Sequence, residues 1–169
     1  MRRRWLGQQL LIVSGERILV FGPRDYADRD FVWTTLSAIH AESPIACVVH
    51  GDATGVDGHA RDWAIFHGIE HDPYPADWER IDGPNVRIGV GRNKKPYNIL
   101  AGFNRNGEML RLGCPTRAAS FPDPTKWKGT PGTNDMMSKV RSAVRMGASI
   151  DPVETYHHPK GFMFKERKR

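Results

Sequence analysis

The stretch "VVHGDATGVDGHARDWA", from Val48 to Ala64, joins an apolar run to a helical pattern through a loop rich in glycine and aspartate. Gly51 and Gly55 allow successive backbone N–H groups to converge on an anion, and the positive end of the following helix strengthens such a site. An ordinary turn needs only one or two special residues. We therefore interpret the loop that ends at Asp57 as a ligand site.

Three polar side chains of this loop, Asp52, Thr54 and Asp57, limit the kind of ligand. Carboxylates repel phosphate, but they accept hydrogen bonds from ribose hydroxyls or from an amine. The loop therefore suits a ligand that carries hydroxyl or amine groups besides an anion. Asp57 has an alternative structural role as the cap of the helix that follows.

A second loop, "FGPRDY", follows an earlier apolar run. Gly22 permits close approach of the backbone, and Arg24 offers a planar guanidinium that binds anions with two hydrogen bonds. Asp25 follows directly. The alternative is an ordinary turn closed by an arginine salt bridge.

Two further loops have a similar composition. In "GRNKK", Arg92 and Asn93 combine a charge with an amide, although a solvated helix start explains this segment equally well. In "GTPGTND", Thr133 or Asn134 can cap a helix while Gly132 exposes its N–H to an anion. Each loop alone is compatible with a purely structural role, whereas four of them around one cavity favour a binding site.

The elements that must position these loops alternate between strand and helix patterns. Apolar runs predict strands at 17–21 and 45–49, and 69–74 resembles a third strand, with a weaker strand at 117–121 and a final one at 149–156. Helical spacing predicts helices at 31–39, from Val56 to about Gly68, from about Arg92 onward and at 134–146, with a turn at 105–107. This alternation predicts an α/β fold, a Rossmann-like three-layer sandwich with a mostly parallel sheet. Ligands bind beyond the carboxyl ends of the strands in such sheets.

The chain of 169 residues is expected to form a single domain at 17–156, between an N-terminal extension (1–16) and a basic C-terminal tail (157–169). The formal net charge of +6 comes largely from the two ends, so it does not by itself predict nucleic-acid binding. Cys47 and Cys114 do not make a disulfide framework, which predicts a cytoplasmic protein. No run is long enough to span a membrane, and no spaced His or Cys cluster predicts a metal or cofactor.

Taken together, the segments "GPRDY", "HGDATGVDGHARDWA", "YPADWER", "GRN" and "GTPGTNDM" resemble the YspA-type branch of the SLOG superfamily. The resemblance runs from about Arg17 to Tyr156, and its most specific parts are "HGDATGVD" and "ADW". It implies a Rossmann-like fold that binds nucleotides or nucleotide-derived ligands. Relatives include the LOG-type phosphoribohydrolases, which cleave a base from a nucleoside monophosphate, and the DNA-processing protein DprA.

One loop departs from the hydrolase relatives, which carry "PGGxGTxxE" with a glutamate that assists cleavage. Here "KGTPGTNDMM" places Met136 and Met137 where that glutamate is expected, and Asp135 is the nearest carboxylate. The resemblance therefore implies a retained nucleotide site and a changed hydrolytic residue. Residues 104–116 are expected to be an insertion that reshapes one wall.

Three functions follow from these observations. The leading one is binding of a nucleotide or nucleotide-derived small molecule, ADP-ribose-like or cyclic, by a sensor or sequestering protein, with Trp78 stacking on a base. The second is N-glycosidic hydrolysis, with Asp135 or Asp52 as the catalytic carboxylate. The third, less favoured, is single-stranded nucleic-acid binding, suggested by Trp127 between two lysines. The sequence leaves a homo-oligomer open. The predicted ligand-binding residues are Gly22, Arg24, Asp25, Gly51, Asp52, Thr54, Gly55, Asp57, Trp78, Arg92, Asn93, Gly132, Thr133 and Asn134.

Overall fold

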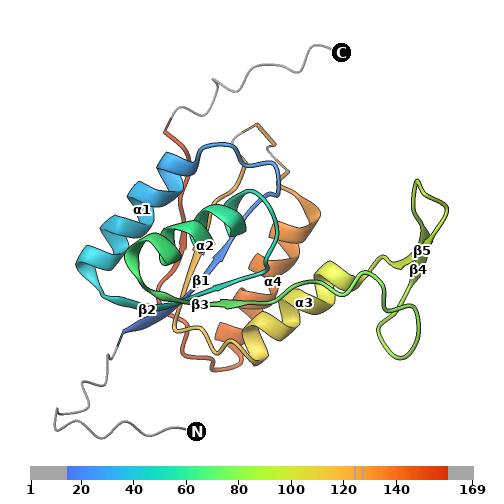
Figure 1. Ribbon diagram of the computed structural model, residues 1–169. Helices are drawn as coiled ribbons and strands as arrows, with labels where there is room; N and C mark the ends of the chain where they lie inside the picture. The colour runs from blue at the N-terminus through green and yellow to red at the C-terminus, as the bar shows by residue number, and fades with distance from the viewer. Residues whose placement is uncertain (1–14, 124, 127, 160–169) are drawn as a thin grey trace, which may run out of the picture.

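The computed structural model describes residues 15–123, 125–126 and 128–159. A five-stranded sheet lies at its centre, with the order β3-β2-β1-β6-β7 and every neighbouring pair parallel (Figure 1). The strands are β1 (Glu16–Phe21), β2 (Ile45–His50), β3 (Glu70–Pro73), β6 (Arg117–Ser120) and β7 (Val153–Thr155). The order reverses between β1 and β6, which makes this the switch point where an open α/β sheet binds ligands.

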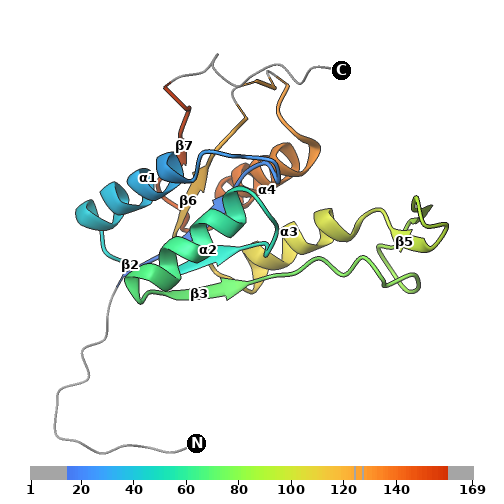
Figure 2. The same ribbon diagram turned by 45° about the horizontal axis from the view of Figure 1, so that its top comes forward.

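Helices α1 (Arg29–Glu42) and α2 (Val56–His67) cover one face of the sheet (Figures 1 and 2). The side chain of Asp28 caps α1 by accepting a hydrogen bond from the backbone N–H of Phe31 at 2.8 Å. Gly68 ends α2 in the left-handed conformation that glycine favours. Both helices agree with their sequence patterns, and α1 extends beyond the predicted bounds at each end.

Helices α3 (Ala101–Arg111) and α4 (Pro131–Arg145) pack together on the opposite face. The expected helix from about Arg92 is wrong, because the chain forms a hairpin there and α3 begins only at Ala101. The expected turn at 105–107 is also wrong, because those residues lie in the middle of α3. Residues 104–116, expected to be an insertion, are most of α3 and its exit, so they are an integral element of the sandwich.

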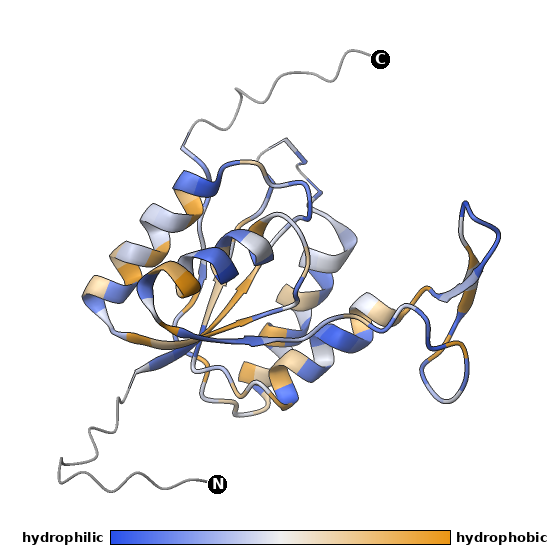
Figure 3. Cartoon of the chain, viewed as in Figure 1, coloured by the Kyte–Doolittle hydropathy of each residue, from blue (hydrophilic) through white to orange (hydrophobic). Residues whose placement is uncertain are grey.

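The core consists of two clusters, one on each side of the sheet. Val32, Leu36 and Trp63 from the first helix pair pack on one face, and Met109 and Met136 from the second pair pack on the other. Figure 3 shows the hydrophobic residues concentrated in the central strands. Two helical layers around a parallel sheet are the Rossmann-like three-layer sandwich that the sequence predicts.

A small antiparallel hairpin, β4 (Ile88–Val90) with β5 (Pro96–Asn98), projects beyond α3 in Figures 1 and 2. The predicted strand 149–156 is shorter in the structure, where β7 has only three residues. Most of the predicted N-terminal extension and basic tail, residues 1–14 and 160–169, lies outside the described residues. Among the described residues, no helix is long and apolar enough to cross a membrane.

Candidate functional site

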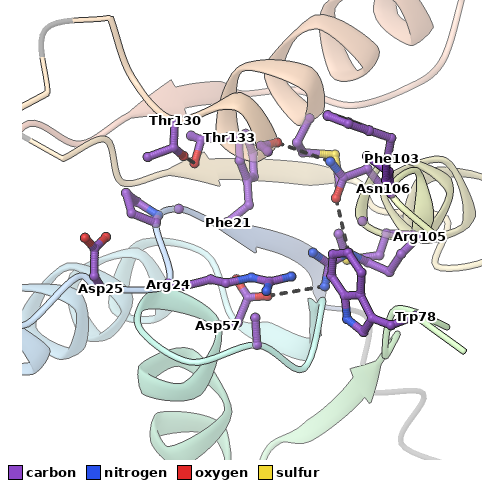
Figure 4. A pocket seen from close by; sticks show the side chains of 18 residues that line it. Phe21, Arg24, Asp25, Asp57, Trp78, Phe103, Arg105, Asn106, Thr130 and Thr133 are labelled. Carbon is purple, nitrogen blue, oxygen red and sulfur yellow. Dashed lines mark hydrogen bonds and ion pairs between the residues drawn. The ribbon is translucent and has the colours of Figure 1, made fainter. Parts of the chain in front are cut away.

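A cavity of about 360 Å³ opens at the carboxyl edge of the sheet, between the ends of β1 and β2 and the helices α3 and α4 (Figure 4). This volume lies in the range of small-molecule sites. Its lining combines an apolar floor with charged and amide groups. The lining residues are Phe21, Gly22, Pro23, Arg24, Asp25, Ala53, Asp57, Trp78, Ile99, Gly102, Phe103, Arg105, Asn106, Met109, Thr130, Gly132, Thr133 and Met136.

The loop after β2 is folded around the buried carboxylate of Asp57. Its Oδ2 atom accepts a hydrogen bond from the backbone N–H of Gly51 at 3.0 Å, which closes the loop on itself. The alternative role of Asp57 as the α2 cap is wrong, because Gly55 occupies the cap position and no side chain caps this helix. Gly55 has a φ of 70°, and a Cβ atom there would collide with the backbone of Pro23 and Arg24. This glycine therefore lets the two cavity loops touch.

Arg105 reaches across from α3 to the same loop. Its guanidinium donates to the carbonyl oxygen of Gly51 and lies 3.8 Å from the Asp57 carboxylate. Burial raises the pKa of Asp57 to about 6, although Arg105 and the backbone N–H groups of Ala53 and Gly51 act in the opposite direction. Burial also lowers the pKa of Arg105. Both side chains are largely buried, so this ion pair is a structural part of the cavity wall and not a solvent-exposed contact.

Arg24 differs from Arg105 because it is exposed and has no acidic partner within 4.0 Å among the described residues. Its guanidinium lies over the ring of Trp78, 5.0 Å from the ring centroid. Trp78 thus holds the side chain at the cavity wall while the charge stays available to a ligand. The neighbouring Asp25 is paired with Lys126 at 2.7 Å, so it does not neutralise Arg24.

The N-terminus of α4 forms the opposite wall (Figure 4). Thr130 occupies the cap position, and its hydroxyl bonds to the Thr133 hydroxyl at 2.8 Å instead of capping the helix. The backbone N–H groups of Gly132 and Thr133 have no acceptor among the described residues. Free N–H groups in the first turn of a helix bind anions.

A second hollow of about 360 Å³ adjoins the first and shares part of its wall. The residues common to both are Arg24, Ala53, Trp78 and Arg105. Asp52 and Thr54 line only the second hollow, where Asp52 lies 3.6 Å from Arg61. The backbone N–H of Asp52 donates to Nδ1 of the buried His50 at 3.1 Å, and burial lowers the pKa of this imidazole to about 4, so His50 is neutral and can accept the bond.

Three of the four predicted loops meet at this cavity, and one does not. The expectation that Gly91–Asn93 joins them is wrong, because Arg92 and Asn93 lie in the turn of the projecting hairpin. Asn134 also lies outside the lining: its amide donates to the Lys128 carbonyl at 2.7 Å and packs against Gly129.

The two carboxylates predicted to be catalytic do not line the main cavity. Asp135 accepts a hydrogen bond from Asn106 at 2.8 Å and forms an ion pair with Lys139. Asp52 faces the second hollow. Asp57 is the deeply buried carboxylate of the main cavity.

Sequence reasoning missed the contribution of α3, which supplies Phe103, Arg105, Asn106 and Met109. The signal was the spacing of Phe103 and Leu110, which are seven residues apart and so share one helical face, with no proline between them. Poor helix formers such as Gly102 and Asn106 obscured it. No group of three or more potential metal ligands occurs in the part of the chain that the structure describes.

Residues 16–81 match the model of the YspA, cpYpsA-related SLOG family. The match covers 66 of the 169 residues of the chain. The matched segment spans β1 to β3 and ends just after Trp78, so it contributes the loops of Arg24 and Asp57 to the cavity. The resemblance expected from "GPRDY" and "HGDATGVD" is thereby confirmed.

DNA processing protein A (DprA) from Streptococcus pneumoniae is a structural neighbour, with a TM-score of 0.57 and 13% sequence identity. The match covers 88% of this chain and 52% of that one, so the chain spans about half the length of DprA. At this identity the likeness supports the fold alone. Among curated protein sequences, none matches the chain.

Proposed function

We propose that the protein binds a nucleotide or nucleotide-derived small molecule in this cavity, as a sensor or sequestering protein. The observation that carries the proposal is the pairing of Arg24, without an acidic partner among the described residues, with free N–H groups at the start of α4 around one cavity. Both elements favour an anion. The cavity lies at the switch point of a Rossmann-like sheet, where such folds bind nucleotides.

The apolar part of the cavity suits a base. Phe21, Phe103 and Met136 offer a surface on which a flat heterocycle can pack. The Asn106 amide already donates to the Gly132 carbonyl and to Asp135, but its oxygen, which accepts from Arg105, has a second acceptor position for a base. A phosphate would then lie toward Arg24 and the N-terminus of α4. Trp78 keeps its proposed role as a stacking residue, with one face of its ring engaged by Arg24.

The second hollow favours a ligand larger than a mononucleotide. The two hollows meet at Arg24 and Arg105. A ligand with a phosphate at these arginines could therefore place one ring system in each hollow. The Asp52 carboxylate and the Thr54 oxygen would then accept hydrogen bonds from sugar hydroxyls, since the Thr54 hydroxyl itself donates to the Arg24 carbonyl. ADP-ribose-like and cyclic nucleotides have this composition.

The direct test is native mass spectrometry of the protein purified from cells, followed by identification of any retained small molecule. We expect a phosphate-containing species that is released on denaturation. Calorimetry with adenosine monophosphate, ADP-ribose and a cyclic dinucleotide then ranks the ligand classes. If no phosphate-containing species is retained and none of these compounds binds at millimolar concentration, the proposal is wrong.

N-glycosidic hydrolysis is the second candidate function, and the burial of Asp57 at the main cavity favours it. A buried carboxyl with a pKa raised to about 6 is suited to proton transfer near neutral pH. Asp57 therefore replaces Asp135 and Asp52 as the carboxylate that we would assign to such a reaction. The expectation of single-stranded nucleic-acid binding rests on Trp127, which lies outside the described residues.

A further inference from the structure

The β4–β5 hairpin is the largest feature of the fold that the cavity does not use. Its turn carries the exposed side chains of Arg92, Lys94 and Lys95, and Arg87 precedes β4. From Gly83 to Gly107 the sequence contains no aspartate or glutamate. None of these four cations has an acidic partner within 4.0 Å among the described residues. The hairpin is therefore a region of uncompensated positive charge.

The hairpin is held in a defined position by its base. Asn98 is buried, and its Oδ1 atom accepts hydrogen bonds from the backbone N–H groups of Arg87 and Leu100 at 3.2 and 3.0 Å. The amide of Asn104 in α3 donates to the Asn85 carbonyl at 2.8 Å. These bonds fix the hairpin to the start of α3, from which it projects away from the sheet (Figure 2).

One face of the hairpin exposes apolar side chains beside the charges. Ile88 and Val90 are 57% and 72% exposed, and they lie on the same face of β4 because side chains alternate along a strand. Pro96 pairs with Val90 across the ladder. The hydrophobic stretch and the hydrophilic turn of the hairpin are visible in Figure 3.

We infer that this hairpin is a nucleic-acid-binding arm, in which the cations contact the sugar-phosphate backbone and Ile88 and Val90 contact bases. A narrow two-stranded ribbon fits into a groove of nucleic acid, and a series of cations without acids attracts the phosphates of the backbone. Apolar side chains beside such cations pack against bases or insert between them. This inference does not rest on the proposed function of the cavity.

The test uses the full chain and fluorescence anisotropy with short labelled DNA and RNA, single-stranded and duplex, over a range of salt concentrations. The test variant combines Arg87→Gln, Arg92→Gln, Lys94→Gln and Lys95→Gln. The matched control combines Arg29→Gln, Arg111→Gln, Arg141→Gln and Arg145→Gln, which removes the same charge from exposed positions on the helices. Thermal melts of both variants verify that each is folded.

We expect the hairpin variant to bind about tenfold or more weakly near physiological salt, with a salt slope reduced by roughly 0.7 to 0.9 for each lost phosphate contact. The affinity of the control variant should fall by about threefold or less, because its substitutions remove only long-range electrostatic attraction. A third variant, Ile88→Thr with Val90→Thr, should weaken binding while leaving the salt slope unchanged, since it removes no phosphate contact.

Equal losses in the hairpin variant and the control would overturn the inference, since binding would then follow net charge alone. So would the absence of binding to every nucleic acid. Hairpin-dependent binding to vesicles that contain phosphatidylserine, without binding to nucleic acid, would identify a membrane surface as the partner instead. None of these outcomes depends on whether the cavity retains a nucleotide, so the two proposals can fail separately.

Discussion

The Oδ2 atom of Asp57 lies 3.8 Å from the Nη1 atom of Arg105, and both side chains are about nine-tenths buried. This pair joins the loop after β2 to α3, two elements far apart in the sequence. It fixes the shape of the cavity because Arg105 also donates to the carbonyl of Gly51. The site is thus held together by a charge pair that has been removed from water at a cost in desolvation.

The pair makes stability depend on pH in a definite direction. Burial raises the pKa of Asp57 from its ordinary value of 3.8 to about 6, so the unfolded chain loses this proton at lower pH than the folded protein does. As pH rises between these two values, the wild type should lose stability relative to Asp57→Asn, by about 1.4 kcal/mol for each pH unit. Above pH 6 the difference should level off.

Urea unfolding of both proteins at several pH values between about 4 and 7 measures this difference. The relevant quantity is the gap between the two free energies of unfolding, because other titrating groups contribute equally to both. A gap that stays constant with pH would contradict the raised pKa of Asp57.

Arg24 is expected to contribute directly to binding of a phosphate-containing ligand. Arg24→Ala should weaken binding by about 1.5–3 kcal/mol, the range for hydrogen bonds to a charged group. Arg145→Ala, which removes an exposed charge at the end of α4, should change binding by less than about 0.5 kcal/mol. Calorimetry with the ligand identified by mass spectrometry provides the comparison, and equal losses would argue against a specific contact.

Gly55 tests the contact between the two cavity loops. Gly55→Ala combines a positive φ with a collision against the backbone of Pro23 and Arg24, so we expect a loss of about 2 kcal/mol or more in stability. Gly58→Ala, in the first turn of α2, has only an ordinary contact at 3.5 Å and should be neutral or stabilising. Thermal melts of both variants would distinguish them; similar melting temperatures would contradict the structural role of Gly55.

The sequence predicted the sheet and three of the four loops, because β1 and β2 are largely apolar, buried runs and the carboxyl ends of parallel strands meet at one edge. The prediction of secondary structure from the sequence is wrong between Tyr74 and Leu112. There the hairpin is short and polar, and α3 contains glycine and asparagine that lower its helix propensity. Arg105 was therefore placed in a turn, and its pairing with Asp57 could not be inferred. Such a pairing depends on tertiary packing that no local pattern encodes.

The cavity is expected to bind a nucleotide without hydrolysing it. The first two turns of α4 carry Met136 and Met137 where the glutamate of the hydrolase relatives is expected. Asp135 is engaged by Asn106 and Lys139 and lies outside the lining, so we expect Asp135→Asn to leave turnover unchanged. Asp57 faces the cavity, but its Oδ2 atom already accepts the Gly51 N–H and lies beside Arg105. These contacts favour a structural anion over a proton donor. We therefore expect slow or absent release of free base when the protein is incubated with adenosine, guanosine or cytidine monophosphate or with NAD, followed by chromatography. Rapid release that disappears in Asp57→Asn, while calorimetry shows that this variant still binds the nucleotide, would establish catalysis in place of binding alone.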